Sequence, residues 1–282
     1  MGLERAPPRH SDPFEPMASR TVSLQNQPIV ELFDRFVSDL ARRIDDPNVN
    51  RDDLCRDTLT SMYHGSGADY HRLIVDPSVP LAAKAALACL DPRNVTLESE
   101  YYSEVDPRRF YRNKPLMWLW IMFDRSPLGH NDHLGVIFRR MLAKRIFKSC
   151  GENVKFFRNV EFSFGYNITC GSNTVFHRDV FVDDRGEVII GDNVSMSDFV
   201  NIYSHAHDII DINDVSLGRT VIGDGARLTY HATVLSGMKV GRDAMVGTVG
   251  VVTKDVPDHH INVGIPAKTV KVKDRGQARS KA

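Results

Sequence analysis

The sequence predicts a mainly β protein in which a parallel β-helix, built from a six-residue repeat, follows an α-helical region. Three observations support this prediction. Hydrophobic residues recur at helical spacing within residues 27–150, and a period of six replaces that spacing within residues 151–274. The chain has 282 residues, which is long enough to bury a core in both parts.

The composition is that of an ordinary globular protein, with 42% hydrophobic and 9% aromatic residues. The 36 basic and 36 acidic residues cancel, so no overall charge attracts nucleic acid or an anionic membrane. The most apolar run, residues 116–123, is shorter than the ~20 residues that span a bilayer. The start of the chain is polar and proline-rich, unlike a signal peptide. We therefore expect a cytoplasmic protein with no membrane span and no nucleic-acid partner.

The four cysteines, Cys55, Cys89, Cys150 and Cys170, lie far apart in the sequence and form no C-x-x-C pair. This spacing is not that of a disulfide framework or a zinc knuckle, and it fits a reducing compartment. We expect each to be a small, unreactive, buried residue.

The amino-terminal half is predicted to be a flexible arm, residues 1–26, followed by a mostly α-helical region, residues 27–150. The first helix begins near Pro28, places Phe33, Phe36 and Leu40 on one face, and stops at Asp46. Further helices are expected at residues 52–64, 80–90 and 133–148. The last has a basic face that includes Arg139, which we interpret as a solvated face rather than a membrane or partner surface. Residues 275–282 are predicted to be a polar tail.

The six-residue repeat is clearest from residue 222 onward, where the chain reads IGDGAR, LTYHAT, VLSGMK, VGRDAM, VGTVGV and VTKDVP. The first position is always aliphatic and the fifth is mostly small. Earlier units begin at Ile190 and Met196, and weaker ones are assigned to Phe162, Ile168, Thr174 and Val180. Such a period indicates short strands that each point one aliphatic side chain inward, separated by tight corners. Three units make a triangular coil, and coils stack about 4.8 Å apart. A β-sandwich would instead show a period of two.

Stacked coils leave an apolar layer at each end, so both ends of the β-helix need a cover. We expect the helical region to cover one end and the segment after Val263 to cover the other. The repeat is interrupted twice. The units at Val180 and Ile190 are ten residues apart, and those at Ile202 and Ile222 are twenty apart. Because loops that leave a rigid scaffold often carry functional sites, we expect the site at these interruptions.

These motifs resemble the hexapeptide-repeat acyltransferase family, and within it the maltose and galactoside O-acetyltransferase branch, over residues 151–272. The resemblance is carried by the segments IGDNVSM (from Ile190), SHAHD (from Ser204), VIGDGARL (from Val221), VVTKDVP (from Val251) and GIPAKTVK (from Gly264). It implies a left-handed parallel β-helix, a homotrimer with each active site between two subunits, and acetyl-CoA, or another acyl-CoA, as the co-substrate. The implied reaction transfers an acetyl group to a hydroxyl of a sugar or small metabolite.

The resemblance also implies a histidine general base in the second interruption. It places His207 at that position, with His205 as the competing candidate. A neutral imidazole, whose ordinary pKa is about 6.5, would take the proton from the acceptor hydroxyl as the oxygen attacks the thioester. The mechanism needs no covalent intermediate.

Other positions are assigned by the same resemblance. Four are expected to bind the acyl donor, with basic side chains near the phosphates: Thr253, Lys254, Lys268 and Lys271. Asp183 and Asp184 match an acidic pair that helps to hold a sugar acceptor, although the pair could equally form a tight turn. Sugar-acetylating relatives carry an asparagine near the position of His177, which we expect to substitute as a hydrogen-bonding group.

Three alternatives remain at this point. An amino-sugar N-acyltransferase would use the same donor. A zinc carbonic anhydrase on this fold needs three converging histidines, and the chain has His231 but Ser236 five residues later, so no metal is expected. A non-catalytic trimeric scaffold would have no reason to bind acetyl-CoA.

Overall fold

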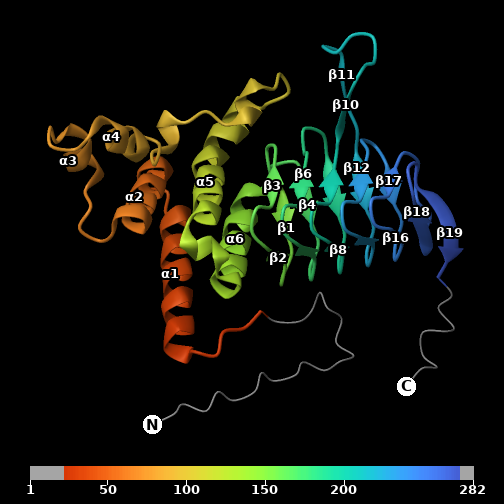
Figure 1. The fold of residues 1–282 in the computed structure, drawn as a ribbon, viewed down its shortest axis with the longest axis horizontal. Coiled ribbons are helices and arrows are strands. Elements are labelled where there is room, and N and C mark those ends of the chain that lie inside the picture. The colour runs from red at the N-terminus through yellow and green to blue at the C-terminus, as the bar shows by residue number, and fades with distance from the viewer. Residues whose placement is uncertain (1–21, 274–282) are drawn as a thin grey trace.

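The computed structural model describes residues 22–273, so the predicted arm lies mostly outside the described residues, and the predicted tail lies wholly outside them. Figure 1 shows two parts: helices gather at one end, and short strands stack in register along the other. Within the described residues no helix has both the length and the hydropathy to cross a membrane.

The predicted helices are confirmed as α1 (Gln27–Asp45), α2 (Arg51–His64), α4 (Leu81–Ala88) and α6 (Asp132–Ile146). Between them lie α3 (Tyr70–Val75) and the 3-10 turns η1 (Pro92–Asn94), η2 (Glu98–Tyr101) and η3 (Pro127–His130). One long helix, α5 (Pro107–Arg125), was not predicted, although its apolar run was recognised in the sequence. This helix is buried on most sides, so it lacks the one-sided pattern of an amphipathic helix.

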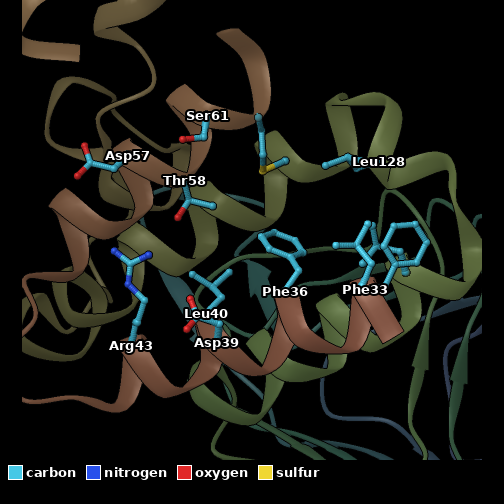
Figure 2. A pocket seen from close by; sticks show the side chains of 12 residues that line it. Phe33, Phe36, Asp39, Leu40, Arg43, Asp57, Thr58, Ser61 and Leu128 are labelled. Atoms are coloured by element: carbon cyan, nitrogen blue, oxygen red, sulfur yellow. The ribbon is translucent and has the colours of Figure 1, made fainter. Parts of the chain in front are cut away.

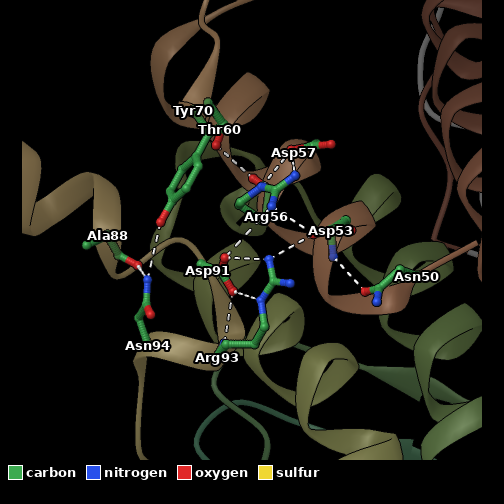
Figure 3. Close-up of polar contacts among 10 residues, drawn as sticks. All are labelled: Asn50, Asp53, Arg56, Asp57, Thr60, Tyr70, Ala88, Asp91, Arg93 and Asn94. Atoms are coloured by element: carbon green, nitrogen blue, oxygen red, sulfur yellow. Dashed lines mark hydrogen bonds and ion pairs between the residues drawn. The ribbon is translucent and has the colours of Figure 1, made fainter. Parts of the chain in front are cut away.

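A polar network fixes α2 against η1 (Figure 3). The side chain of Asn50 accepts a hydrogen bond from the backbone N–H of Asp53 and begins the helix. Arg56, only 5% exposed, pairs with Asp53. Arg93 bonds both Asp91 and Asp53, which joins η1 to the helix.

The strands form the predicted parallel β-helix of three sheets. Sheet A contains β1 (Ser149–Cys150), β4 (Ile168–Cys170), β7 (Val188–Ile190), β12 (Thr220–Ile222) and β15 (Lys239–Val240). Sheet B contains β2 (Lys155–Phe156), β5 (Val175–Phe176), β8 (Ser195–Met196), β13 (Arg227–Leu228), β16 (Met245–Val246), β18 (His260–Val263) and β19 (Lys268–Val272). Sheet C contains β3 (Glu161–Phe162), β6 (Phe181–Val182), β9 (Asn201–Ile202), β14 (Thr233–Val234) and β17 (Val251–Val252). The chain visits the sheets in the order A, B, C in each of five coils.

The register of the early units differs from the prediction. Cys150 pairs with Cys170 and Cys170 with Ile190, so each of the first two coils takes 20 residues, two more than three units of six. The first positions of these units are therefore Cys170, Phe176 and Val182, and not Ile168, Thr174 and Val180, although these three are also buried. The assignment of Phe162 was right. The error arose because apolar residues stand in both registers at two places, Ile168 with Cys170 and Val180 with Val182.

All the extra residues lie at one corner, between sheets C and A, which we call the insertion corner (residues 163–167, 183–187 and 203–219). The first two insertions do not protrude. Asp183, Asp184 and Arg185 are at most 6% exposed, and they form a buried bend instead of the predicted loop. The third insertion, in the coil where Ile190 pairs with Ile222, does protrude. It forms an antiparallel hairpin of β10 (His205–His207) and β11 (Val215–Leu217), visible in Figure 1 above the coils.

The helical region covers the first coil, as predicted. Trp120 of α5 packs on Phe156 and Phe162, with ring centroids 5.3 Å apart in both cases. Arg139 is completely buried and bonds Asp124 through Nε at 2.6 Å, so it is not part of a solvated basic face as predicted. At the other end, the segment after Val263 forms β19, which pairs antiparallel with β18.

The four cysteines are free, as predicted. Cys55 and Cys170 are buried, and burial raises the pKa of both thiols. Cys89 is exposed, contrary to the prediction, because it follows the last residue of α4 at the surface.

Candidate functional site

The two candidate histidines lie on the same strand of the protruding hairpin. His205 and His207 belong to β10, where they pair with Leu217 and Val215 of β11. Their ring centroids are 5.1 Å apart. The hairpin therefore presents two imidazoles together at the insertion corner.

His205 is held by a buried carboxylate. Its Nδ1 lies 2.5 Å from Oδ2 of Asp183, whose residue exposure is only 1%. The same carboxylate accepts from the backbone N–H of Ser204 at 3.1 Å and from the hydroxyl of Ser163 at 3.0 Å. Because the partner of Nδ1 is a carboxylate, Nδ1 carries the proton, and Nε2 of the neutral ring is the atom that can accept one.

His207 is more exposed and less firmly held. Its Nδ1 lies 2.7 Å from the carbonyl oxygen of Ile212, within the same hairpin. Ile212 is itself 71% exposed. A carbonyl can orient the imidazole, but it carries no charge that would stabilise an imidazolium ion.

Both histidines line a cleft of about 400 Å³. The later coils also contribute to its lining, through Leu235, Met238 and Thr253. Thr253 was predicted as a donor-binding residue, so the structure brings one of the four beside the histidines. Lys254 follows it in the chain and is exposed. Lys268 and Lys271 are also exposed and lie farther along, on β19, where they pair with Val263 and Ile261.

The predicted acidic pair divides into two different environments. Asp183 contacts His205, as described above. Asp184 is completely buried and accepts the backbone N–H groups of Phe164 at 2.7 Å and Asn167 at 3.1 Å. Burial raises the pKa of Asp184 to about 6. Through these bonds its carboxylate holds the first insertion in place, and it does not line the cleft. Of the two interpretations of the acidic pair, the tight turn therefore applies to Asp184.

His177 lies at a different corner, between sheets B and C. Its ring stacks on Phe157, with centroids 5.2 Å apart and an angle of 2° between the planes. Burial lowers the pKa of this histidine. The structure does not bring His177 to the cleft of its own subunit, and an acceptor-binding role for it stays a prediction.

Sequence reasoning missed most of the other lining residues. Two of them, Tyr203 and Leu235, stand directly after the inward residue of a sheet C strand. Every sheet C strand has a residue at this position, and we call the set the edge column: Ser163, Asp183, Tyr203, Leu235 and Thr253. With the correct register, this shared position would have identified the edge column from the sequence. Ser204 is fully buried, and the only feature of the sequence that pointed to it was its place in the polar SHAHD motif.

Two further features bear on alternative functions. Among residues 22–273, no three His, Cys, Asp or Glu side chains converge as a metal site would require. A groove of about 460 Å³ lies in the helical region, where Phe33, Phe36 and Leu40 of α1 face Thr58 and Ser61 of α2 (Figure 2).

Comparison with known proteins identifies relatives, although no family model matches the chain. Galactoside O-acetyltransferase of Escherichia coli (strain K12) is 27% identical over 174 residues, which are 60% of this chain and 82% of the relative. A solved galactoside acetyltransferase in complex with coenzyme A superposes with a TM-score of 0.53 at 26% identity, covering 60% of this chain and 82% of the other.

A maltose O-acetyltransferase from Clostridium difficile 630 gives a TM-score of 0.52 at 25% identity, covering 60% of this chain and 88% of the other. A hexapeptide-repeat acetyltransferase from Vibrio cholerae shares the fold, with a TM-score of 0.53 at 20% identity, and covers 64% of this chain and 96% of the other. Together with the six-residue coils and the histidine hairpin, these likenesses show that the chain is similar in sequence and fold to the galactoside and maltose O-acetyltransferases.

Proposed function

We propose that this protein transfers an acetyl group from acetyl-CoA to a hydroxyl of a sugar or similar small molecule, with His205 as general base. O-acetyl transfer is the reaction named for the relatives that the chain resembles, and one of the solved relatives holds coenzyme A. The observation that carries the proposal for this chain is the pair of His205 and the buried Asp183 at the mouth of the cleft.

The resemblance favoured His207, and the contacts favour His205. A general base gains a positive charge in the transition state, and a buried carboxylate on the far side of the ring stabilises that charge. His205 has such a partner, whereas His207 has a carbonyl on an exposed hairpin. His207 remains the alternative base, two residues along the same strand.

The reaction then follows from these positions. Nε2 of His205 takes the proton of the acceptor hydroxyl as its oxygen attacks the thioester carbonyl carbon. The carbon–sulfur bond of the resulting tetrahedral intermediate breaks, and the sulfur of coenzyme A receives the proton from the imidazolium. The enzyme ends in its starting protonation state, and no covalent acyl-enzyme forms.

The acyl donor is proposed to lie along the later coils. Thr253 is the residue of this set that lines the cleft, and Lys254, Lys268 and Lys271 lie between it and the carboxyl-terminal end. Each lysine offers a point charge to a phosphate rather than the two-pronged contact of an arginine. An amino-sugar nitrogen could attack the same thioester, so N-acyl transfer is the second candidate function.

We also propose a homotrimer, as the family resemblance implies. Light scattering should then give about three times the chain mass of 31.8 kDa. A stable monomer at micromolar concentration would contradict an active site shared between subunits.

Substitution of each histidine tests the base. His205→Ala should lose roughly 10²–10⁴-fold in kcat, the usual contribution of a positioned general base. Binding of coenzyme A, measured by calorimetry, should survive, because the base contacts the reacting end. His207→Ala should show a modest effect. The reverse result would assign the base to His207, and near-full activity in both variants would refute the mechanism.

A further inference from the structure

One segment of the helical region lies against the insertion corner. This segment, residues 98–109, runs from η2 into the first turn of α5, and we call it the linking segment. Figure 1 shows it, in yellow, on the same side of the coils as the hairpin. Arg109 donates to the carbonyl oxygen of Tyr166 at 2.6 Å, and the backbone N–H of Asp106 donates to the hydroxyl oxygen of Tyr166 at 2.8 Å. The first insertion is therefore fastened to the helical region.

The second insertion is joined to the linking segment by a buried ion pair. Nη2 of Arg185 donates to Oε1 of Glu104 at 2.5 Å, and the exposed fractions of the two side chains are only 6% and 13%. The guanidinium also lies over the ring of Tyr102, 4.2 Å from its centroid. Burial acts to raise the pKa of Glu104, but the hydrogen bond from Arg185 and its charge lower that pKa below its usual value. Both groups are therefore charged at neutral pH.

Three consecutive side chains of the buried bend contact three different elements. Asp183 bonds His205 of the hairpin. Asp184 bonds the backbone of the first insertion, and Arg185 bonds the helical region. The bend is thus the place where the hairpin, the coils and the helical region are joined.

The bend is also packed tightly under the hairpin. A Cβ atom on Gly186 would lie 2.7 Å from the carbonyl oxygen of Ser204 and 2.6 Å from that of Gly218. The backbone N–H of Gly186 donates to the Ser204 hydroxyl at 2.8 Å, and that hydroxyl donates to the carbonyl oxygen of Asp183 at 2.5 Å. A displacement of the bend would therefore change the contacts at the base of the hairpin, where His205 begins its strand.

The ion pair is not arranged for the greatest stability. Nε of Arg185 and Oε2 of Glu104 are buried and have no hydrogen-bond partner among residues 22–273. Two parallel bonds between a guanidinium and a carboxylate would be the stronger arrangement. A buried ion pair also contributes little net stability compared with apolar residues of similar volume. The position that the pair imposes on the bend explains it better than stability does.

We propose that Arg185 and Glu104 are positioning residues for the base: through their ion pair the helical region holds the bend, and the bend holds Asp183 against His205. This inference rests on the proposed function, because it takes His205 as the base. Neither Arg185 nor Glu104 lines the cleft, so their effect on the reaction passes through the Asp183 carboxylate. The helical region then acts on the reaction from outside the cleft.

Glu104→Ala tests the proposal, because it leaves Arg185 without its partner. With acetyl-CoA and methyl β-galactoside as substrates, kcat should fall roughly tenfold to 10²-fold, the usual effect of a displacement of about 1 Å in a catalytic group. KM for acetyl-CoA should stay the same, since the donor residues lie elsewhere. If Glu104→Ala does not fold, Glu104→Gln replaces it, with a smaller loss expected, because it keeps an oxygen for the bond from Arg185.

Glu100→Ala is the matched control. It removes an ion pair of similar burial from the same linking segment, because Glu100 pairs with Lys114 of α5 at 2.8 Å and their side chains are 14% and 10% exposed. This pair lies within the helical region and does not reach the bend. Glu100→Ala should therefore lower the melting temperature about as much as Glu104→Ala does and keep kcat.

A proton NMR signal reports the orientation of His205 without any turnover. The hydrogen on Nδ1 that bonds Asp183 is protected from exchange with water and should give a downfield signal, which is assigned by its absence from His205→Ala. The signal should weaken or disappear in Glu104→Ala, because the carboxylate is no longer held against the ring. It should persist in Glu100→Ala.

The outcomes separate this inference from the proposed function. An unchanged signal in Glu104→Ala overturns the inference and leaves the function intact, and so does an equal fall of kcat in Glu100→Ala, which would reflect lower stability alone. Loss of the signal in Glu104→Ala, when the parent enzyme transfers no acetyl group, supports the positioning of the histidine and overturns the function. Loss of the signal with unchanged kcat shows that the orientation of His205 does not affect the reaction, and the inference is then wrong.

Discussion

Replacement of Asp183 by asparagine isolates the contribution of its charge. In the native protein Oδ2 of Asp183 accepts from both Ser204 N–H and His205 Nδ1, and Oδ1 accepts from the Ser163 hydroxyl. An asparagine whose carbonyl oxygen replaces Oδ2 keeps the first two bonds. Its amide nitrogen then donates to the Ser163 hydroxyl, which can rotate to accept. The asparagine variant should therefore fold and keep the orientation of His205, and lose only the negative charge.

The size of the effect follows from the charge on the imidazole. Hydrogen bonds to a charged group contribute about 1.5–3 kcal/mol, and hydrogen bonds between neutral groups contribute about 0.5–1.5 kcal/mol. The lower ends of these two ranges differ by about 1 kcal/mol, which we take as the smallest expected loss. Two unit charges about 4 Å apart attract by about 4 kcal/mol at an effective dielectric constant of about 20, which sets the upper limit. Because about 1.4 kcal/mol is a tenfold change in rate, kcat of Asp183→Asn should fall between about 5-fold and 10³-fold.

Steady-state kinetics with acetyl-CoA in excess measures this loss, and thermal unfolding checks that the fold is retained. The effect should be on kcat, with KM for acetyl-CoA unchanged, because Asp183 acts on the base and not on the donor. Asp198→Asn, the same change in a surface pair with Arg178, is the matched control and should keep full activity. A loss of less than about threefold in Asp183→Asn would refute the assignment of His205 as the base and favour His207.

Three further perturbations are informative. Arg139→Met should lower the free energy of unfolding by about 3–5 kcal/mol in chemical denaturation, since it leaves Asp124 buried without its partner. Asp184 has a pKa raised to about 6, so its contribution to stability is full below its ordinary pKa of 3.8 and is lost as the pH rises through 6. The parent should accordingly gain about 1 kcal/mol relative to Asp184→Asn between pH 7.5 and pH 5, measured by the same method. Lys254→Ala and Lys268→Ala should each raise KM for acetyl-CoA more than they lower kcat, and unchanged KM in both would leave these lysines as surface residues.

The late coils could be predicted from the sequence and the early coils only in part. From Ile222 to Val252 an aliphatic residue stands at every sixth position, and the position two residues earlier is small or polar in most units. In the early coils both positions are apolar: Val180 precedes Val182 by two, and Ile168 precedes Cys170. The pattern cannot choose between the two registers there. Only the structure shows that Asp184 holds the first insertion, which contains the two extra residues of its coil, by a hydrogen bond from the backbone N–H of Phe164.

The candidate site, like the coils, could be predicted from the sequence only in part. Motif and loop reasoning located His205, His207 and Asp183, because an interruption of a regular repeat is visible in a single sequence. It could not pair Asp183 with His205, since that bond depends on how two insertions of different length stack at one corner.

The geometry of the β-helix explains why the proposed base and the proposed donor residue Thr253 lie along one corner of the coils. Each coil must close in register with the next, so extra residues are tolerated only where a corner can expand. Here they all lie at the insertion corner, and the edge column beside it runs from Ser163, under the helical region, to Thr253 near the carboxyl-terminal end. The proposed base, His205, lies at the middle of this column and is held by the coil itself, through Asp183. Because Asp183 belongs to a buried bend of the coil and not to the protruding hairpin, the position of the base does not depend on how the tip of the hairpin is placed.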